Sequence, residues 1–329
     1  MTPTRRDVLK LAGTTTAIAT VGTTGAATVA RQDDELPAYG RWLTLEDGAL
    51  EFTYLDWAAL EEFVADELEA AEPDEEVPAE YEADPMIAPV SEGALGTYLY
   101  AGLDLAQYRL GRLLDDGETF ESTVEELLRT PAAFVALGAI DPAEIDARLT
   151  AEPEAGFITQ LERTDGIGAY DVYTPVDADD AAIAVDEDAL VVATESEDPI
   201  AALETIVDAA DGETERAIED SEPFSWVLES AGDGDAVVGQ YGPEAGTEGL
   251  ADFEFEELED AEAIVSSLTV EDAETSTGEF AAVVDEPDEP ALEALLGASG
   301  ENQSVEVDGD RVTATATWRE EAVTVPRVR

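Results

Sequence analysis

Alternating apolar and polar residues recur along the chain, and stretches with helical spacing separate them. An apolar residue at every second position predicts a strand with one buried face, whereas apolar residues three and four apart predict a helix. On this basis we expect strands at 49–57, 132–140, 156–163, 168–175, 236–241, 263–270 and 278–285. Helices are expected at 58–71, 95–114, 123–128, 142–149, 199–210 and 290–296, and another ends at 226–230.

Two tight turns predict β-hairpins, one joining 181–186 to 189–194 and the other joining 304–308 to 311–318. Both turns read Val-Asp-x-Asp and are followed by residues with high strand propensity. The likeness has two explanations: an internal duplication, or the turn chemistry that unrelated hairpins share.

Other local signals delimit the remaining elements. Asp141 precedes Pro142, which suits an N-cap followed by the first helical residue, and Gly212 is placed to end the helix over 199–210. Asp165-Gly166 is expected to form a turn between two strands. Residues 72–89 contain four prolines and many carboxylates, which predicts a long exposed loop.

Taken together, the pattern predicts an α+β fold: antiparallel sheets with helices packed on one face, with two related units as one option. The expected organisation is a leader at 1–30, an α+β domain at 31–212 that includes the acidic loop near 72–89, and a second α+β unit at 213–329.

Charge changes this picture most. The 329 residues include 80 Asp and Glu but only 15 Lys and Arg, for a formal net charge of -65. Crowded carboxylates destabilise a compact chain unless salt screens them, and at about 1 M salt the screening length falls to about 3 Å. The composition therefore indicates a protein adapted to concentrated brine, surrounded by a diffuse cloud of cations. Scattered single arginines argue against binding to nucleic acid or to anionic membranes.

The N-terminal segment has the order of an export signal. Arg5 and Arg6 are followed by an apolar pair and a lysine, after which 11–30 is uncharged and rich in Ala, Thr and Gly. This resembles the twin-arginine (Tat) export motif. Small residues near position 30 suit signal-peptidase cleavage, and no later apolar run reaches the length of a membrane span. We expect an extracellular or cell-surface protein without a stable span in its mature form.

The chain has no histidine and no cysteine, which removes most side chains that carry enzymatic chemistry. Ser-His-Asp and Cys-His nucleophile systems are excluded, as are zinc and haem sites that need these ligands. No cofactor is expected. Carboxylate chemistry remains: a glycosidase needs two Asp or Glu about 5 to 9 Å apart, and aromatic residues such as Trp42, Trp57, Trp226, Trp318, Tyr98 and Tyr100 could stack on sugar.

Two kinds of site remain open. Asp233 with Asp235, and Asp186 with Asp188, place carboxylates in expected loops, which suits Ca²⁺, although neither completes an EF-hand pattern. Asn302-Gln303-Ser304 is an N-glycosylation sequon, and Asn302 is the single asparagine in the sequence.

The leader and the acidic body together resemble exported haloarchaeal Tat proteins of unknown function, with the hairpin and helix at 180–212 as a looser likeness. The resemblance implies no activity. We expect a non-enzymatic binding or structural protein outside the cell. The alternatives are a carboxylate-dependent hydrolase acting on extracellular glycan and a Ca²⁺-binding surface protein.

Overall fold

The computed structural model describes residues 36–61, 79–115, 119–153, 155–194, 196, 198–242, 250, 253, 255–272 and 275–319. The expected leader, with Arg5 and Arg6, lies outside the described residues, as does most of the helix expected at 58–71. Residues 57–61, at the start of that helix, are helical.

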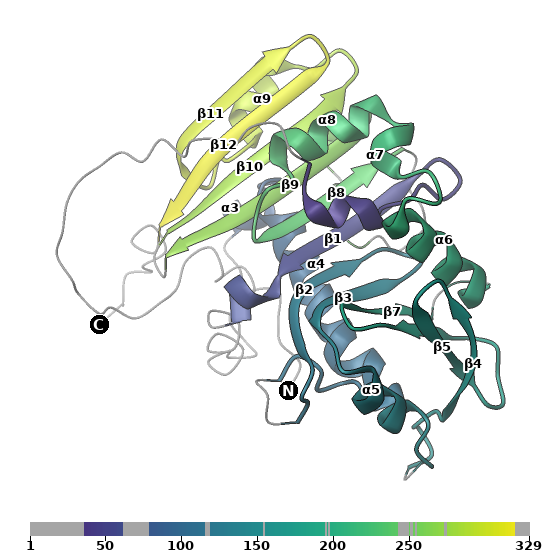
Figure 1. Cartoon of the computed structure of the whole chain (residues 1–329). Helices are drawn as coiled ribbons and strands as arrows, with labels where there is room; N and C mark the ends of the chain where they lie inside the picture. The colour runs from purple at the N-terminus through teal and green to yellow at the C-terminus, as the bar shows by residue number, and fades with distance from the viewer. Residues whose placement is uncertain are drawn as a thin grey trace, which may run out of the picture.

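Twelve strands form one antiparallel sheet in the order β11-β12-β10-β9-β8-β1-β2-β3-β7-β6-β5-β4 (Figure 1). The strands are β1 Leu50–Asp56, β2 Thr123–Arg129, β3 Phe134–Ala139, β4 Leu161–Ile167, β5 Tyr170–Pro175, β6 Ala182–Val185, β7 Ala189–Ala193, β8 Ala236–Tyr241, β9 Ala261–Asp272, β10 Thr275–Val284, β11 Glu301–Asp308 and β12 Arg311–Arg319. The α+β class with antiparallel pairing is therefore confirmed.

Helices cover both faces of the sheet, whereas we expected them on one face. One core contains the apolar side chains of α4 (Ala88–Leu99), α5 (Pro142–Leu149) and α9 (Glu289–Leu295). The other core contains those of the 3₁₀ turn η2 (Ala38–Trp42), α6 (Pro199–Asp211) and α8 (Glu222–Ala231). Figure 1 shows α8 in front of β9 and β10, which it contacts. Shorter elements are α3 Ala79–Glu82, the π turn η3 Tyr100–Asp104, and η4 Leu105–Tyr108, α7 Ala217–Asp220 and η5 Glu256–Leu258.

The first four strands on each side of the central β1–β8 pair follow the same order. On one side β2, β3, β7 and β6 follow β1, and on the other β9, β10, β12 and β11 follow β8. The helices α5 and α9 come after β3 and β10 respectively, and both pack in the same core. Both expected units thus contribute to one sheet, and their descent from a duplication stays a prediction.

Local signals correctly placed several elements. The Asp141 carboxylate accepts a hydrogen bond from the Ala143 N–H at 2.9 Å, as expected of an N-cap. Gly212 ends α6 with a φ of 76°, a conformation that glycine adopts without strain. Both predicted hairpins are confirmed, as β6–β7 and β11–β12.

Several expectations were wrong. Residues 123–128 form strand β2 instead of a helix, because Leu127 and Leu128 bury their side chains in the two opposite cores. The helix expected over 95–114 ends at Leu99 and continues as π and 3₁₀ turns. The turn expected at Asp165-Gly166 lies instead at residues 168–169.

The loop expected at 72–89 is described only from residue 79, and this part is not an exposed loop. Ala79–Glu82 is helical, and Asp84, Met86 and Ile87 are each 0% exposed. The apolar pair Met86-Ile87 joins the core beneath α4, and this burial outweighs the composition of the surrounding segment.

Candidate functional site

Three carboxylates lie side by side at one end of three neighbouring strands. Asp56 at the end of β1 is in register with Glu126 on β2, and its N–H donates to the Asp235 carbonyl at 2.7 Å, just before β8 begins. Residues directly opposite one another in an antiparallel pair project from the same face. We call Asp56, Glu126 and Asp235 the carboxylate row. It is the best candidate for the paired acids that a glycan hydrolase requires.

Two members of the carboxylate row are driven toward the neutral form. Burial raises the pKa of Glu126, and the charge of Asp56 raises it further, against the hydrogen bond that Tyr54 donates to it. Burial likewise raises the pKa of Asp235, against the hydrogen bond from the Val270 N–H. Raised carboxyl pKa values at adjacent positions are typical of catalytic acids, but structural carboxylates share them.

Each carboxylate in the row already accepts a hydrogen bond from the protein. Asp56 accepts from the Ala59 N–H at 3.0 Å and Asp235 from the Val270 N–H at 2.7 Å. Glu126 accepts from the Tyr54 hydroxyl. These bonds fix the ends of the strands and the first helical turn after β1. The three acids therefore have a structural role.

The aromatic rings beside the carboxylate row are buried. Tyr39 stacks on Tyr54 with ring centroids 4.0 Å apart, and their exposed fractions are 3% and 9%. The Tyr39 hydroxyl donates to the Gly232 carbonyl at 2.8 Å. A sugar platform needs an open ring face, so this pair does not provide one.

The aromatic residues singled out in the sequence are mostly in the cores. Trp42, Trp57 and Trp318 are at most 4% exposed. Trp226 is partly exposed, but the Arg311 guanidinium lies over its ring, 4.8 Å from the centroid. Tyr98 stacks on Trp57, and Tyr100 is buried next to Phe134.

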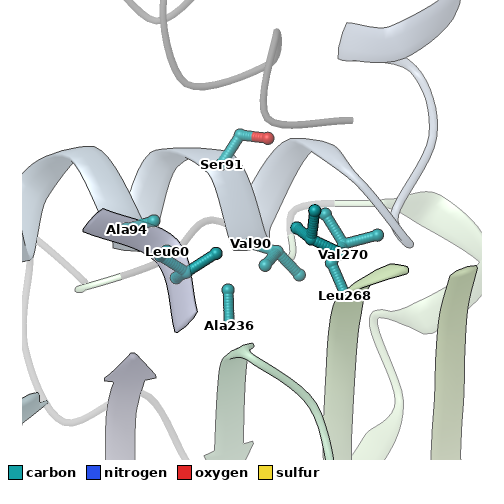
Figure 2. Close-up of a pocket in the computed structure, with 7 residues that line it drawn as sticks. All are labelled: Leu60, Val90, Ser91, Ala94, Ala236, Leu268 and Val270. Atoms are coloured by element: carbon teal, nitrogen blue, oxygen red, sulfur yellow. The ribbon is translucent and has the colours of Figure 1, made fainter. Parts of the chain in front are cut away.

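An apolar hollow lies on the other face of the sheet, beneath α4. Its empty volume is about 270 Å³, solvent at its mouth included, and its lining comes from Leu60, Val90, Ser91, Ala94, Ala236, Leu268 and Val270. Figure 2 shows Val90 pointing from α4 toward the sheet, whereas Ser91 projects from the far side of the helix. Inside there is room for about one water molecule. None of the described carboxylates lines the hollow.

The four acids considered as Ca²⁺ ligands lie in two places, the β6–β7 turn and the segment before β8, and Ca²⁺ binding there stays a prediction. Asp186 caps the β6–β7 turn, since its carboxylate accepts from the N–H groups of Asp188 and Ala189 at 2.7 and 2.9 Å. Asp235 belongs to the carboxylate row, and Asp233 is exposed nearby. Within the described ranges, no three or more acidic side chains are grouped so that they could share a metal ion.

Asn302 lies on the surface, in β11. Its side chain is exposed and its φ is 53°, and it sits where the register between β11 and β12 shifts.

Sequence reasoning missed the most constrained acids. Asp84 is fully buried and accepts four hydrogen bonds, from the N–H groups of Met86, Gly297 and Ser299 and from the Ser299 hydroxyl. Glu144 accepts from the N–H groups of Glu121 and Ser122, from the Ser122 hydroxyl and from Arg148. The apolar pair that follows Asp84-Pro85 is the one local signal that Asp84 enters the core.

Comparison with known proteins assigns no family. No family model matches the chain, and no curated protein matches it significantly. Among solved structures, crystal form III of TP0453 aligns over 88% of this chain and 96% of its own, with 12% identity and a TM-score of 0.43. Crystal form I aligns over the same shares, with 9% identity and a TM-score of 0.44. No helix in the described part of the chain is long and apolar enough to cross a bilayer.

Proposed function

We propose that this chain is a halophilic protein exported by the Tat route, which acts outside the cell as a non-enzymatic binding or structural protein. One observation carries the non-enzymatic part: the carboxylates withdrawn from solvent accept structural hydrogen bonds. The two buried acids of the described residues are Glu51, which accepts from the Leu250 N–H at 3.0 Å, and Asp84. The three acids of the carboxylate row likewise accept hydrogen bonds from the protein.

The proposed location outside the cell rests on the N-terminal leader. The Arg5-Arg6 pair, the uncharged stretch after it and the acidic body that follows support export. The test is fractionation of cells that produce the full chain, with an Arg5→Lys/Arg6→Lys double variant as control. We expect the parent chain in the medium or on the cell surface and the variant inside the cell. A parent chain found only in the cytoplasm would contradict export.

A carboxylate-dependent glycan hydrolase is the second candidate, because Glu126 and Asp235 flank Asp56 and both have a raised pKa. The assay is release of reducing ends from a panel of soluble polysaccharides in molar NaCl. Under our proposal the parent chain releases none. Release that disappears in Glu126→Gln and persists in the exposed neighbour variant Glu125→Gln would establish the hydrolase instead.

A further inference from the structure

Strand β11 is one of the two edge strands of the sheet, and β4 is the other. In the described part of the chain it pairs with β12 alone, and α9 packs against it. A strand edge with unpaired N–H and carbonyl groups is a template for pairing with another chain. Proteins protect such edges with charges, bulges or covering groups.

The sequon lies in the irregular part of this edge strand. Glu301 is in register with Thr317 and Ser304 with Thr315, so two residues of β11, Asn302 and Gln303, stand opposite one residue of β12. This is the geometry of a β-bulge, in which the extra residue is left out of the ladder. The φ of 53° at Asn302 fits, because asparagine is among the few residues that adopt this conformation readily.

The side chain of Gln303 anchors the bulge to α9. The Gln303 side-chain amide donates to the carbonyls of Glu293 and Leu296, each at 2.6 Å, which fixes Gln303 to the end of α9. Asn302 and Ser304 are both exposed. The amide that would be modified and the hydroxyl that defines the sequon are therefore accessible on the folded protein, on a backbone that is free of regular pairing.

We propose that Asn302 is N-glycosylated after export and that the glycan covers the open edge of β11. The proposal rests on the proposed Tat export: that route carries folded proteins, so a sequon used outside the cell has to be exposed in the fold. In the transfer, the Asn302 Nδ2 forms a bond to the anomeric carbon of a sugar linked to a lipid phosphate. The bond from that carbon to the phosphate oxygen breaks, the phosphate leaves with the electron pair, and the amide proton passes to a base of the transferase.

The test uses the full chain recovered from the medium of the producing cells. A Glu-specific protease cuts before Asn302, at Glu293 or Glu301, and after it at Glu306, which gives a short peptide for mass analysis. We expect this peptide to carry the added mass of a glycan, to lose it in Ser304→Ala and to keep it in Ser304→Thr, which retains the hydroxyl. Ser304→Ala leaves Asn302 unchanged, so it does not disturb the positive φ.

Light scattering in molar NaCl tests the role of the glycan. We expect Ser304→Ala to associate, with an apparent mass about twice that of Ser304→Thr. An unmodified Asn302 peptide in exported protein overturns the glycosylation and leaves export standing. A chain retained in the cytoplasm overturns both proposals, and a Ser304→Ala protein as monodisperse as the parent overturns the covering of the edge.

Discussion

The Ser299 hydroxyl donates to the buried carboxylate of Asp84 across 2.6 Å, joining positions 215 residues apart. The Trp318 indole N–H donates to the same hydroxyl at 2.9 Å. Since the N–H groups of Gly297 and Ser299 also point at Asp84, the segment before α4 is tied to the connection between α9 and β11. One acid thus links the two expected units on the face that α4 and α9 cover.

Replacing Asp84 with alanine should destabilise the protein by about 3 kcal/mol or more, because it leaves buried N–H groups without an acceptor. Chemical denaturation in constant molar NaCl measures this free energy. The control is Asp177→Ala, which removes an exposed carboxylate and should change stability by less than about 0.5 kcal/mol. An equal loss of unfolding free energy in the two variants would show that the hydrogen bonds to Asp84 do not stabilise the fold.

Glu144 should stabilise the fold at neutral pH and lose this effect in acid. Burial alone would raise its pKa, but the hydrogen bonds from Ser122, Glu121 and Arg148 outweigh burial and lower it. A pKa lower in the folded state adds stability that is present above the unfolded value, about 4.3, and is lost as pH falls through the folded value. Glu144→Gln should therefore cost about 2 kcal/mol at pH 7 and progressively less below pH 4. A cost independent of pH would contradict this account.

Glu126 should behave in the opposite way. Its pKa is raised by burial first and by Asp56 next, so its contribution to stability is present below the unfolded pKa and is lost as pH rises through the folded value. Glu126→Gln keeps an acceptor for Tyr54 and removes the charge. It should raise the melting temperature at pH 7, by an amount worth up to about 1 kcal/mol. Glu125→Gln, at the exposed neighbouring position, is the matched control, and an equal rise there would attribute the effect to general charge reduction.

Much of the fold follows from local chemistry. The β6–β7 turn is specified by Asp186, whose carboxylate caps it, and α5 and α6 begin at Asp141 and Asp198, which cap their first N–H groups. Such signals act within a few residues and need no knowledge of the rest of the chain. For this reason the hairpins and capped helices could be predicted.

Long-range packing explains what could not be predicted. The Glu125-Glu126-Leu127-Leu128 run has helical composition, yet β2 is a strand because β1 and β3 pair with it on either side. Asp84 lies in an acidic, proline-rich segment, and its burial depends on donors from residues 297 and 299. The carboxylate row depends on register among three strands that are distant in sequence. Apart from the apolar pair Met86-Ile87 after Asp84, none of these relations has a local signature.

Two buried serines should respond in opposite directions to removal of the hydroxyl. Ser91 on α4 is 4% exposed and its hydroxyl has no hydrogen-bond partner among the described residues. Ser122 is 2% exposed, and its hydroxyl donates to Glu144 and accepts from the Asp141 N–H. A buried hydroxyl without a partner costs about 1 to 3 kcal/mol. Ser91→Ala should stabilise the protein and Ser122→Ala should destabilise it, as measured by thermal melts at one salt concentration. Destabilisation by Ser91→Ala would indicate a bond to its hydroxyl in solution.

Salt should decide whether the chain folds at all. The net charge of -65 places far more carboxylates than arginines on the protein, so repulsion among exposed acids opposes the folded state. The screening length falls from about 10 Å at 0.1 M to about 3 Å at 1 M, a change that spans the spacing of neighbouring surface charges. The melting temperature should therefore rise steeply with NaCl over this range, and in dilute buffer the cooperative transition should be lost. Sucrose at equal osmolality is the control, because it strengthens burial without screening charge and should restore little of the transition. A full cooperative melt in salt-free buffer would mean that the acids are neutralised in some other way than by screening.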